Sequence, residues 1–497
     1  MKMNRREFLG TVKGSAGLLA VGGGFLNLGC RGEKDLLGPG ETERPPEEMT
    51  LPGRIRLPIP DTIHPEGLAL GAQPGSVSSA NGGPFPAWMY RESLPGPTLR
   101  VRSGDTVRLD LQNGLPEETI VHWHGLDVPE HADGHPRFAV SPGQSFAYDF
   151  SVRNRAGTYW YHPHTHRRTG AQTYRGLAGF LIVDDAEDEG LGLPSGDREI
   201  PLVIQDKRLD GSGTPVYEPF GPDLMLGYLG DIPFVNGAPF PYIDVDRALH
   251  RLRILNGSNA RIYDLAFSDG RPLVLIGTDG GLLESPEGLA SIFLGPAERV
   301  DVLVDFSTYE PGDRVTLQSR SFQIPGGMGM GMGFGGGQGQ AMDLMEFVVR
   351  SGQASSSAIP GALANLPAAP AVSGVQHRPF QLRSMMSRHL INGRTFEMDR
   401  VDLQVPVGDT EVWRFINNSP MPHPVHMHAG QFRVLSRSGG RNRVFPWEGG
   451  LKDTVLLLPF ESVEVAVRFE EHRGLFLLHC HNLEHEDAGM MLNFEVI

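Results

Sequence analysis

Residues 479–490, HCHNLEHEDAGM, place a cysteine, three histidines and a methionine within a short stretch of chain. Cys480 is one of only two cysteines in 497 residues; His485 follows it by five positions and Met490 by ten. Two imidazoles, a thiolate and a weak axial thioether are the ligands of a blue-copper electron-transfer site. The spacing therefore predicts such a site here, with its second histidine supplied from elsewhere in the chain.

The histidines that flank Cys480 predict a second kind of site. In an extended strand successive side chains alternate between faces, so Cys480 would point one way and His479 and His481 the other. One strand could then serve two metal sites, and an electron would pass between them over a single covalent residue step.

Three more His-x-His pairs occur in the chain. They are His122 and His124 in VHWHG, His162 and His164 in WYHPHTH, and His426 and His428 in HPVHMH. Residues i and i+2 of a strand share a face, so each pair can present two imidazoles to one site. His423 lies at an odd offset from His426, which turns it to the face of Cys480. Zinc is a poorer interpretation, because the sequence has no CxxC or HExxH motif.

These four segments resemble the four copper-binding motifs of multicopper oxidases, in the same order, and the last two are most similar to the bacterial laccase and copper-efflux oxidase branch. The resemblance implies four copper ions: one type 1, one type 2 and a type 3 pair. It assigns His423, Cys480, His485 and Met490 to type 1, His122 and His426 to type 2, and His124, His162, His164, His428, His479 and His481 to type 3. Every ligand position is filled, although the family also includes structural proteins that have lost their coppers.

The resemblance implies a laccase-like oxidase with O₂ as a partner. A phenolic or aromatic reductant, or a metal ion such as Cu(I), would lose electrons at the type 1 copper, and O₂ would be reduced to water at the trinuclear cluster. Cys480, His479 and His481 would carry the electrons. Asp133 and Glu486 would deliver protons, or would only hydrogen-bond the ligand imidazoles. The alternative is a non-catalytic exported copper-binding or scaffold protein on the same fold.

Two sequence patterns recur three times and predict tandem domains. One occupies 96–114, 237–258 and 393–419, and the other occupies 141–150, 295–306 and 458–469. The segments are short, rich in β-branched and aromatic residues and separated by Gly, Pro, Asn and Asp, which predicts antiparallel strands in a sandwich or barrel. Together with the resemblance, this gives an all-β fold of three tandem cupredoxin-like Greek-key domains.

The patterns also predict where the domains begin and end. We expect an export signal at 1–30, a tether at 31–50, domain 1 at 51–190, domain 2 at 191–350, a linker at 351–375 and domain 3 at 376–497. The middle domain has no His-x-His pair. The trinuclear site is therefore expected at the interface of domains 1 and 3, with domain 2 as a spacer.

The N-terminal segment predicts where the protein works. Arg5 and Arg6, followed by a short apolar stretch, are typical of a twin-arginine export signal rather than a membrane span. We expect a periplasmic or cell-envelope protein. Cys30 is a candidate lipid anchor, although Asn27 stands where such motifs have Leu; the alternative is that Cys30 is removed or idle. The net charge of −15 argues against a nucleic-acid partner.

A segment rich in glycine and methionine, at 326–345, departs from a plain laccase. Its Met328, Met330 and Met332 are candidate thioether ligands for substrate Cu(I); the alternative is a low-complexity loop without a role. Met421 resembles a position that helps to hold substrate copper in copper-efflux oxidases. Ser419 stands where that branch has an aspartate.

Overall fold

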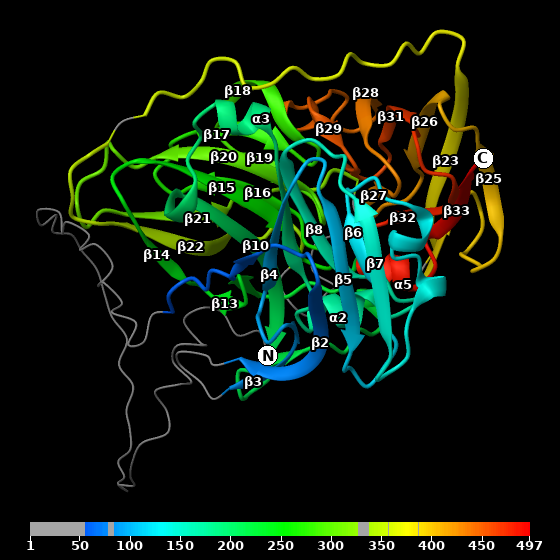
Figure 1. The fold of residues 1–497 in the computed structure, drawn as a ribbon, viewed down its shortest axis with the longest axis horizontal. Coiled ribbons are helices and arrows are strands. Elements are labelled where there is room, and N and C mark those ends of the chain that lie inside the picture. The colour runs from blue at the N-terminus through cyan, green and yellow to red at the C-terminus, as the bar shows by residue number, and fades with distance from the viewer. Residues whose placement is uncertain (1–54, 78–83, 327–336, 356, 386) are drawn as a thin grey trace, which may run out of the picture. The chain divides into compact units, whose positions relative to one another are not determined.

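The computed structural model describes residues 55–77, 84–326, 337–355, 357–385 and 387–497. In these residues the chain is built mainly of β-strands, which form six sheets, two from each of three successive stretches of the chain (Figure 1). The export signal, Cys30, the tether, Met328, Met330 and Met332 lie outside the described residues.

The first stretch forms sheets of strand order β1-β4-β9-β8-β6 and β3-β2-β5-β7. The strands are β1 (Thr62–Ile63), β2 (Leu68–Val77), β3 (Phe85–Tyr90), β4 (Gly96–Arg102), β5 (Thr106–Asn113), β6 (Val121–His124), β7 (Ser145–Ser151), β8 (Gly157–Pro163) and β9 (Gly179–Asp184).

The second stretch forms sheets of order β13-β12-β10-β15-β20-β17-β18, with β11 paired to β10, and β14-β22-β21-β16-β19. The strands are β10 (Glu199–Leu209), β11 (Pro215–Val216), β12 (Ile232–Val235), β13 (Ala238–Pro239), β14 (Tyr242–Val245), β15 (Leu249–Asn256), β16 (Tyr263–Phe267), β17 (Leu273–Thr278), β18 (Gly281–Leu289), β19 (Ile292–Leu294), β20 (Arg299–Asp305), β21 (Arg314–Ser319) and β22 (Met342–Val349).

The third stretch forms sheets of order β24-β23-β26-β31-β28-β29 and β25-β33-β32-β27-β30. The strands are β23 (Gln376–Met385), β24 (Arg388–Ile391), β25 (Val401–Val405), β26 (Thr410–Asn417), β27 (His423–Met427), β28 (Phe432–Ser438), β29 (Leu451–Lys452), β30 (Thr454–Leu457), β31 (Ser462–Arg468), β32 (Gly474–Cys480) and β33 (Met491–Val496).

Helices are short and lie between strands. They are α2 (Thr169–Tyr174), α3 (Ala186–Gly190), α4 (Gly221–Leu226), α5 (Leu483–Asp487) and the 3₁₀ turns η1 (Glu130–Ala132), η2 (Pro136–Phe138), η3 (Gly196–Arg198) and η4 (Pro446–Glu448). Across the described ranges, none of the helices has the length and apolar character needed to cross a membrane.

The same strand arrangement occurs three times. Strands β5, β15 and β26 each lie between a parallel neighbour, respectively β2, β10 and β23, and an antiparallel neighbour, respectively β7, β20 and β31. The all-β prediction is confirmed, but the strands are not all antiparallel as expected. Parallel partners need long crossover connections, and here other strands of the same stretch supply them.

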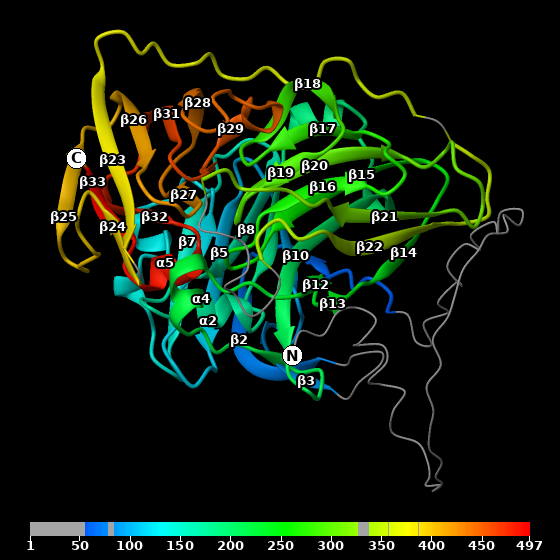
Figure 2. The same ribbon diagram turned by 180° about the vertical axis from the view of Figure 1, so that it is seen from behind.

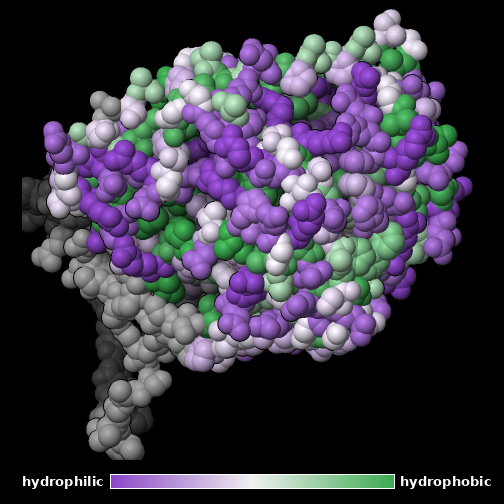
Figure 3. Space-filling view, in the orientation of Figure 1, coloured by the Kyte–Doolittle hydropathy of each residue, from purple (hydrophilic) through white to green (hydrophobic). Residues whose placement is uncertain are grey.

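Burial follows from where each strand lies. In β5, Val107, Leu109 and Leu111 are buried and alternate with outward-facing residues, as expected for a strand with one solvent-facing side. Strand β15 is buried along its whole length, so its Arg253 is fully buried and pairs with Glu199 and Asp301. Polar residues dominate the face of the molecule in Figure 3, where apolar residues are scattered.

The glycine-rich segment is shorter than the sequence predicted. Strand β22 begins at Met342, and the side chains of Met342 and Met345 are buried in the core of the second stretch. Their apolar neighbours in that core explain why these two methionines join the strand. Residues 342–345 therefore belong to a strand and not to a loop.

Truncating a core residue of the third stretch should destabilise it strongly. Phe415 on β26 is fully buried, so Phe415→Ala should lower the free energy of unfolding by about 3–5 kcal/mol, measured by denaturant titration. Arg414→Ala, one residue earlier and exposed, is the matched control and should change it by less than about 0.5 kcal/mol. Equal effects of the two changes would contradict this packing.

Candidate metal centre

The four His-x-His pairs come from two equivalent pairs of strands. In the first stretch β6 pairs with β8, with His122 opposite His162. In the third stretch β27 pairs with β32, with His426 opposite His479. The strands at the same positions of the middle stretch, β16 and β21, also pair with each other but carry no histidine. The first and third stretches therefore hold equivalent halves of one histidine cluster.

Imidazole rings join these halves. His122 stacks on His428 with ring centroids 3.8 Å apart, and His124 stacks on His426 at 3.6 Å. Figure 1 shows β6 and β8 beside β27 and β32, and Figure 2 shows β8 beside β27 and β32 from behind, although their residues are hundreds of positions apart in the sequence. The cluster thus lies between the first and third stretches.

Within the cluster, ligand atoms gather into three buried groups that share some members. Each group has its three atoms within 4.8 Å of one another: His122, His124 and His426; His124, His162 and His481; and His164, His428 and His479. Opposed ring nitrogens are 3.2–3.3 Å apart, both between the first and third stretches and within each of them. All eight paired histidines therefore face one another.

A separate group forms around Cys480 on the other face of β32. The Sγ atom of Cys480 lies 3.4 Å from His423 Nδ1 and 3.7 Å from His485 Nδ1, and the two nitrogens are 3.2 Å apart. Met490 is fully buried and belongs to the same apolar cluster as Cys480. The backbone amide of Met490 donates to His485 O, and that of Cys480 donates to Met490 O, which holds the segment compactly.

Burial sets the protonation of these ligands. It lowers the pKa of His164 and of His423 to about 3, so both imidazoles are neutral near pH 7 and offer a lone pair. Burial also raises the pKa of the Cys480 thiol, and the nearby carboxylates of Glu486 and Glu484 raise it further. A bound metal ion would stabilise that thiolate.

Comparison with known proteins identifies the family. Two multicopper oxidase family models match residues 72–188 and 367–497. The laccase of Bacillus subtilis is 30% identical over 481 residues, covering 83% of this chain and 90% of the laccase. The chain belongs to the multicopper oxidase family. This multicopper oxidase contains copper, and it uses electrons from a reductant to reduce O₂.

Two further similarities extend over most of the chain. The structure of the McoA multicopper oxidase from Aquifex aeolicus superposes with a TM-score of 0.81 at 35% identity, covering 89% of this chain and 99% of McoA. The cell division protein FtsP of Dickeya dadantii is 34% identical over 453 residues, covering 88% of this chain and 91% of FtsP. The expected fold of three tandem cupredoxin-like domains is confirmed.

The residues present fit copper. Metal–imidazole bonds are about 2.0–2.1 Å long, so one ion at a tetrahedral angle holds two nitrogens roughly 3.3 Å apart, close to the separations in the cluster. A shared N–H proton could give the same distance, but His481 argues against that as a general explanation. It is buried, and neither of its ring nitrogens has a hydrogen-bond partner among the described residues. The near-equilateral His423, Cys480 and His485 triangle suits a trigonal copper site.

Both predicted acids touch ligand histidines. Asp133 Oδ2 lies 2.7 Å from His428 Nδ1, and Asp133 O accepts from His122 Nδ1 at 2.6 Å. Burial raises the pKa of Asp133 well above its ordinary range. Glu486 Oε2 lies 3.1 Å from His479 Nδ1. Burial would raise the pKa of Glu486, but the nearby imidazoles outweigh it and lower the pKa to about 2.

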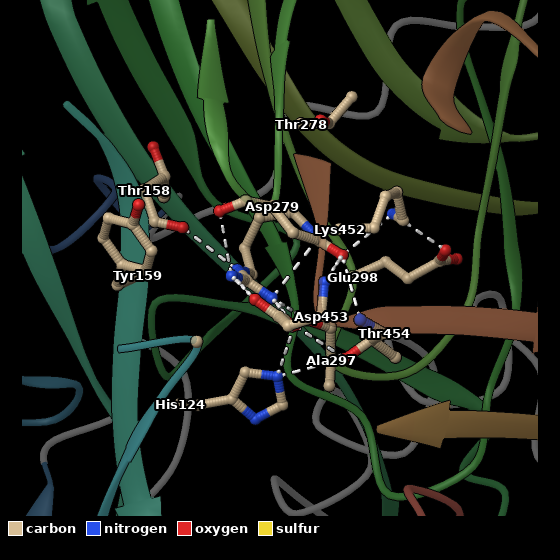
Figure 4. Close-up of polar contacts among 12 residues, drawn as sticks. His124, Thr158, Tyr159, Thr278, Asp279, Ala297, Glu298, Lys452, Asp453 and Thr454 are labelled. Carbon is tan, nitrogen blue, oxygen red and sulfur yellow. Dashed lines mark hydrogen bonds and ion pairs between the residues drawn. The ribbon is translucent and has the colours of Figure 1, made fainter. Parts of the chain in front are cut away.

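The sequence reasoning missed a second layer of polar residues behind the cluster. Asp453 Oδ1 lies 3.0 Å from His124 Nε2, and Thr454 Oγ1 lies 3.1 Å from the same nitrogen (Figure 4). Burial would raise the pKa of Asp453, but Arg299 outweighs it and holds that pKa well below its usual range. The signal was a Lys-Asp pair inside the apolar run GLKDTVLLL, because charges in a buried strand need partners.

A second missed residue, His389 on β24, covers the Cys480 group. Its ring stacks on His485 with centroids 3.9 Å apart, and its Nε2 donates to Leu224 O of α4 at 2.7 Å. His485 Nε2 donates to Met225 O of the same helix at 3.0 Å. Helix α4 therefore caps the outer nitrogen of this ligand.

Ser419 and Met421 lie on the inner side of the same group. Ser419 Oγ is 2.8 Å from His423 Nε2, so this hydroxyl helps to orient the ring of His423. Met421 is buried, and its carbonyl accepts from Asn417 Nδ2 at 2.7 Å. Neither side chain is open to solvent.

Acid should destabilise the metal-free protein through its buried histidines. The pKa of an ordinary histidine is near 6.5, whereas burial lowers the pKa of His164 to about 3 in the folded state. Between about pH 6.5 and pH 3 this histidine is protonated in the unfolded chain but not in the folded chain. The free energy of unfolding therefore decreases by about 1.4 kcal/mol for each unit by which the pH is lowered, for each such residue. His164→Gln should reduce the slope of unfolding free energy against pH by up to that amount, measured in urea after copper removal. An unchanged slope would show that His164 does not have a lowered pKa in the folded protein.

Proposed function

We propose that four copper ions bind in this oxidase. The type 1 ion is assigned to His423, Cys480, His485 and Met490, the type 2 ion to His122 and His426, and the type 3 pair to His124, His162, His164, His428, His479 and His481. One observation carries the proposal: Cys480 faces two histidines on one side of β32 while His479 and His481 join histidine groups on the other. One type 3 ion would bind His124, His162 and His481, and the other would bind His164, His428 and His479.

Copper bound at these positions supplies one-electron oxidation at Cys480 and reduction of O₂ at the histidine groups. The chain provides the route between them. An electron at Cys480 Sγ needs to cross only the backbone of one residue to reach His479 or His481. Buried neutral imidazoles and the apolar residues around Cys480 exclude water from this path.

Protons for O₂ reduction would come through Asp133 and Glu486. Asp133 Oδ1 is buried and has no hydrogen-bond partner among the described residues, while Oδ2 faces His428 Nδ1. A proton held on Oδ1 would lie at the histidine cluster without breaking the contact to His428. Glu486 would serve the same group of three histidines through its contact with His479.

The organisation of the chain is part of the proposal. We assign domain 1 to 51–190, domain 2 to 191–350, a linker to 351–375 and domain 3 to 376–497. The homology to FtsP and to laccases suggests an exported envelope protein, and Arg5 and Arg6 support export by the twin-arginine route. Cys30 remains the candidate lipid anchor.

The reductant is proposed to be a phenol or aromatic amine, or Cu(I). Met328, Met330 and Met332 supply thioethers suited to Cu(I). Met421, near His423 in sequence and buried, is the proposed inner partner for that ion.

The copper-loaded protein should be blue and should consume O₂ when given a reductant. Cys480→Ser removes the thiolate, so the visible absorption and O₂ uptake should both fall to background, measured by spectroscopy and an oxygen electrode. Cys30→Ser, at the only other cysteine, is the matched control and should leave both intact. A colourless wild-type protein, or a blue Cys480→Ser variant, would refute the assignment.

The methionine segment should matter more for Cu(I) than for phenols. Replacing Met328, Met330 and Met332 together with Leu keeps the length and apolar character but removes the thioethers. We expect Cu(I) oxidation to fall several-fold more than oxidation of a bulky phenol, measured side by side as O₂ uptake. Equal losses with both reductants, or no loss with either, would remove these methionines from substrate binding.

A further inference from the structure

A buried network of charges lies behind the histidine cluster, at Asp453 between β29 and β30 (Figure 4). Its side chain meets His124 Nε2 at 3.0 Å, and its backbone carbonyl meets His426 Nδ1 at 2.9 Å. Thr454 Oγ1 lies 3.2 Å from the same nitrogen of His426. Asp453 and Thr454 therefore orient His124 of the first stretch and His426 of the third.

These contacts decide which nitrogen each histidine turns to the cluster. With Nε2 engaged by Asp453, His124 presents Nδ1, which lies 3.3 Å from His162 Nε2. With Nδ1 engaged, His426 presents Nε2, which lies 3.3 Å from His122 Nε2. Partners of the outer nitrogen fix the tautomer and ring orientation of metal-binding histidines.

The position of Asp453 is fixed in turn by Arg299, from β20 of the middle stretch. The guanidinium donates to both carboxylate oxygens, Nη1 to Oδ1 at 2.7 Å and Nη2 to Oδ2 at 2.6 Å. Its Nε donates to Thr158 O of β8 at 3.0 Å. A bidentate pair of this kind constrains the plane of the carboxylate. One fully buried side chain thus contacts all three stretches.

The surrounding charges hold Arg299 in place. Asp279 Oδ1 accepts from the Arg299 backbone amide at 2.8 Å, and Lys452 Nζ lies 3.0 Å from both Asp279 Oδ2 and Glu298 Oε1. All of these side chains are buried. An uncompensated buried charge is costly, so neither Arg299 nor Asp453 can turn away without leaving its partner unpaired.

We propose that Arg299 is a positioning residue for the trinuclear site. By fixing both oxygens of Asp453, it keeps His124 Nδ1 and His426 Nε2 directed at the copper positions, so the ligand-free middle stretch controls copper binding between the other two. The middle stretch is therefore more than a spacer. This inference rests on the proposed function in taking the histidine groups as copper sites.

The test compares two lysine variants of the full chain loaded with Cu(II). Arg299→Lys keeps a positive charge but cannot grip both oxygens, so the histidine-bound copper should be lost at a chelator concentration roughly 10- to 100-fold lower, measured as copper content. The visible absorption of the Cys480 site should be unchanged. The electron paramagnetic resonance signal of the type 2 copper should shift.

Arg253→Lys is the matched control. Arg253 is equally buried and also contacts Thr158, through Oγ1 at 2.8 Å, but it pairs with Glu199 and Asp301 instead of Asp453. The Arg253→Lys variant should lose its histidine-bound copper at the same chelator concentration as the wild type. Equal copper retention in the two variants would overturn the proposal, as would loss of the visible absorption in step with the histidine-bound copper.

A second variant covers the case in which Arg299→Lys does not accumulate as folded protein. Asp453→Asn keeps the shape of the side chain but removes its charge, and it should show the same selective loss of histidine-bound copper. Full retention there would overturn the proposal. A wild-type protein that binds no copper at the histidine groups would instead contradict the proposed function, which separates the two failures.

Discussion

The antiparallel register of β27 with β32 is the constraint on which both candidate centres depend. Val425 lies opposite Cys480 and His426 opposite His479, so His426 and His479 share one face. Cys480 takes the other face, together with His423 of β27. A slip of one residue would exchange the faces of every side chain on β32. The short path between the centres is therefore a property of the backbone, and the side chains need only occupy the positions it provides.

Concentrating so many polar groups in the interior requires partners for each of them. The rings of His122 and His428, and those of His124 and His426, stack across the interface, and burial lowers the pKa of all four. The charged residues behind them are paired, with Arg299 and Lys452 matched to buried carboxylates. An apolar core surrounds Cys480 on the other side. The metal centre thus lies between a region stabilised by charge pairing and a region stabilised by hydrophobic packing.

The gathering of the paired histidines could be predicted from sequence because their spacing is local. A period of two places His122 and His124 on one face of a strand whatever the rest of the fold does, and the same holds for the pair around Cys480. Arg299 and Asp453 could not be found this way, because their contact joins residues 154 positions apart in different sheets. His389 was missed for the same reason, since nothing near it in sequence marks the ring on which it stacks.

The fold was predicted in class but not in detail. Recurring segments revealed three copies, yet the parallel partner of β5, β15 and β26 depends on which strands meet across the sandwich. Which strands pair in parallel depends on the topology of the whole domain, so no local sequence pattern predicts it. Met342 and Met345 illustrate a related limit: a glycine-rich neighbourhood predicted loop, but the apolar alternation of β22 had already begun.

The equivalent positions of β6 and β27, and of β8 and β32, bear on how such a protein could arise. One copy holds the Cys480 group and only half of the paired histidines, so a single copy cannot by itself complete the histidine cluster. Duplication alone would supply the second half. The middle copy carries no histidine on β16 and β21, and its Arg299 contacts Asp453 of the third copy, so the three copies contribute different parts to one site.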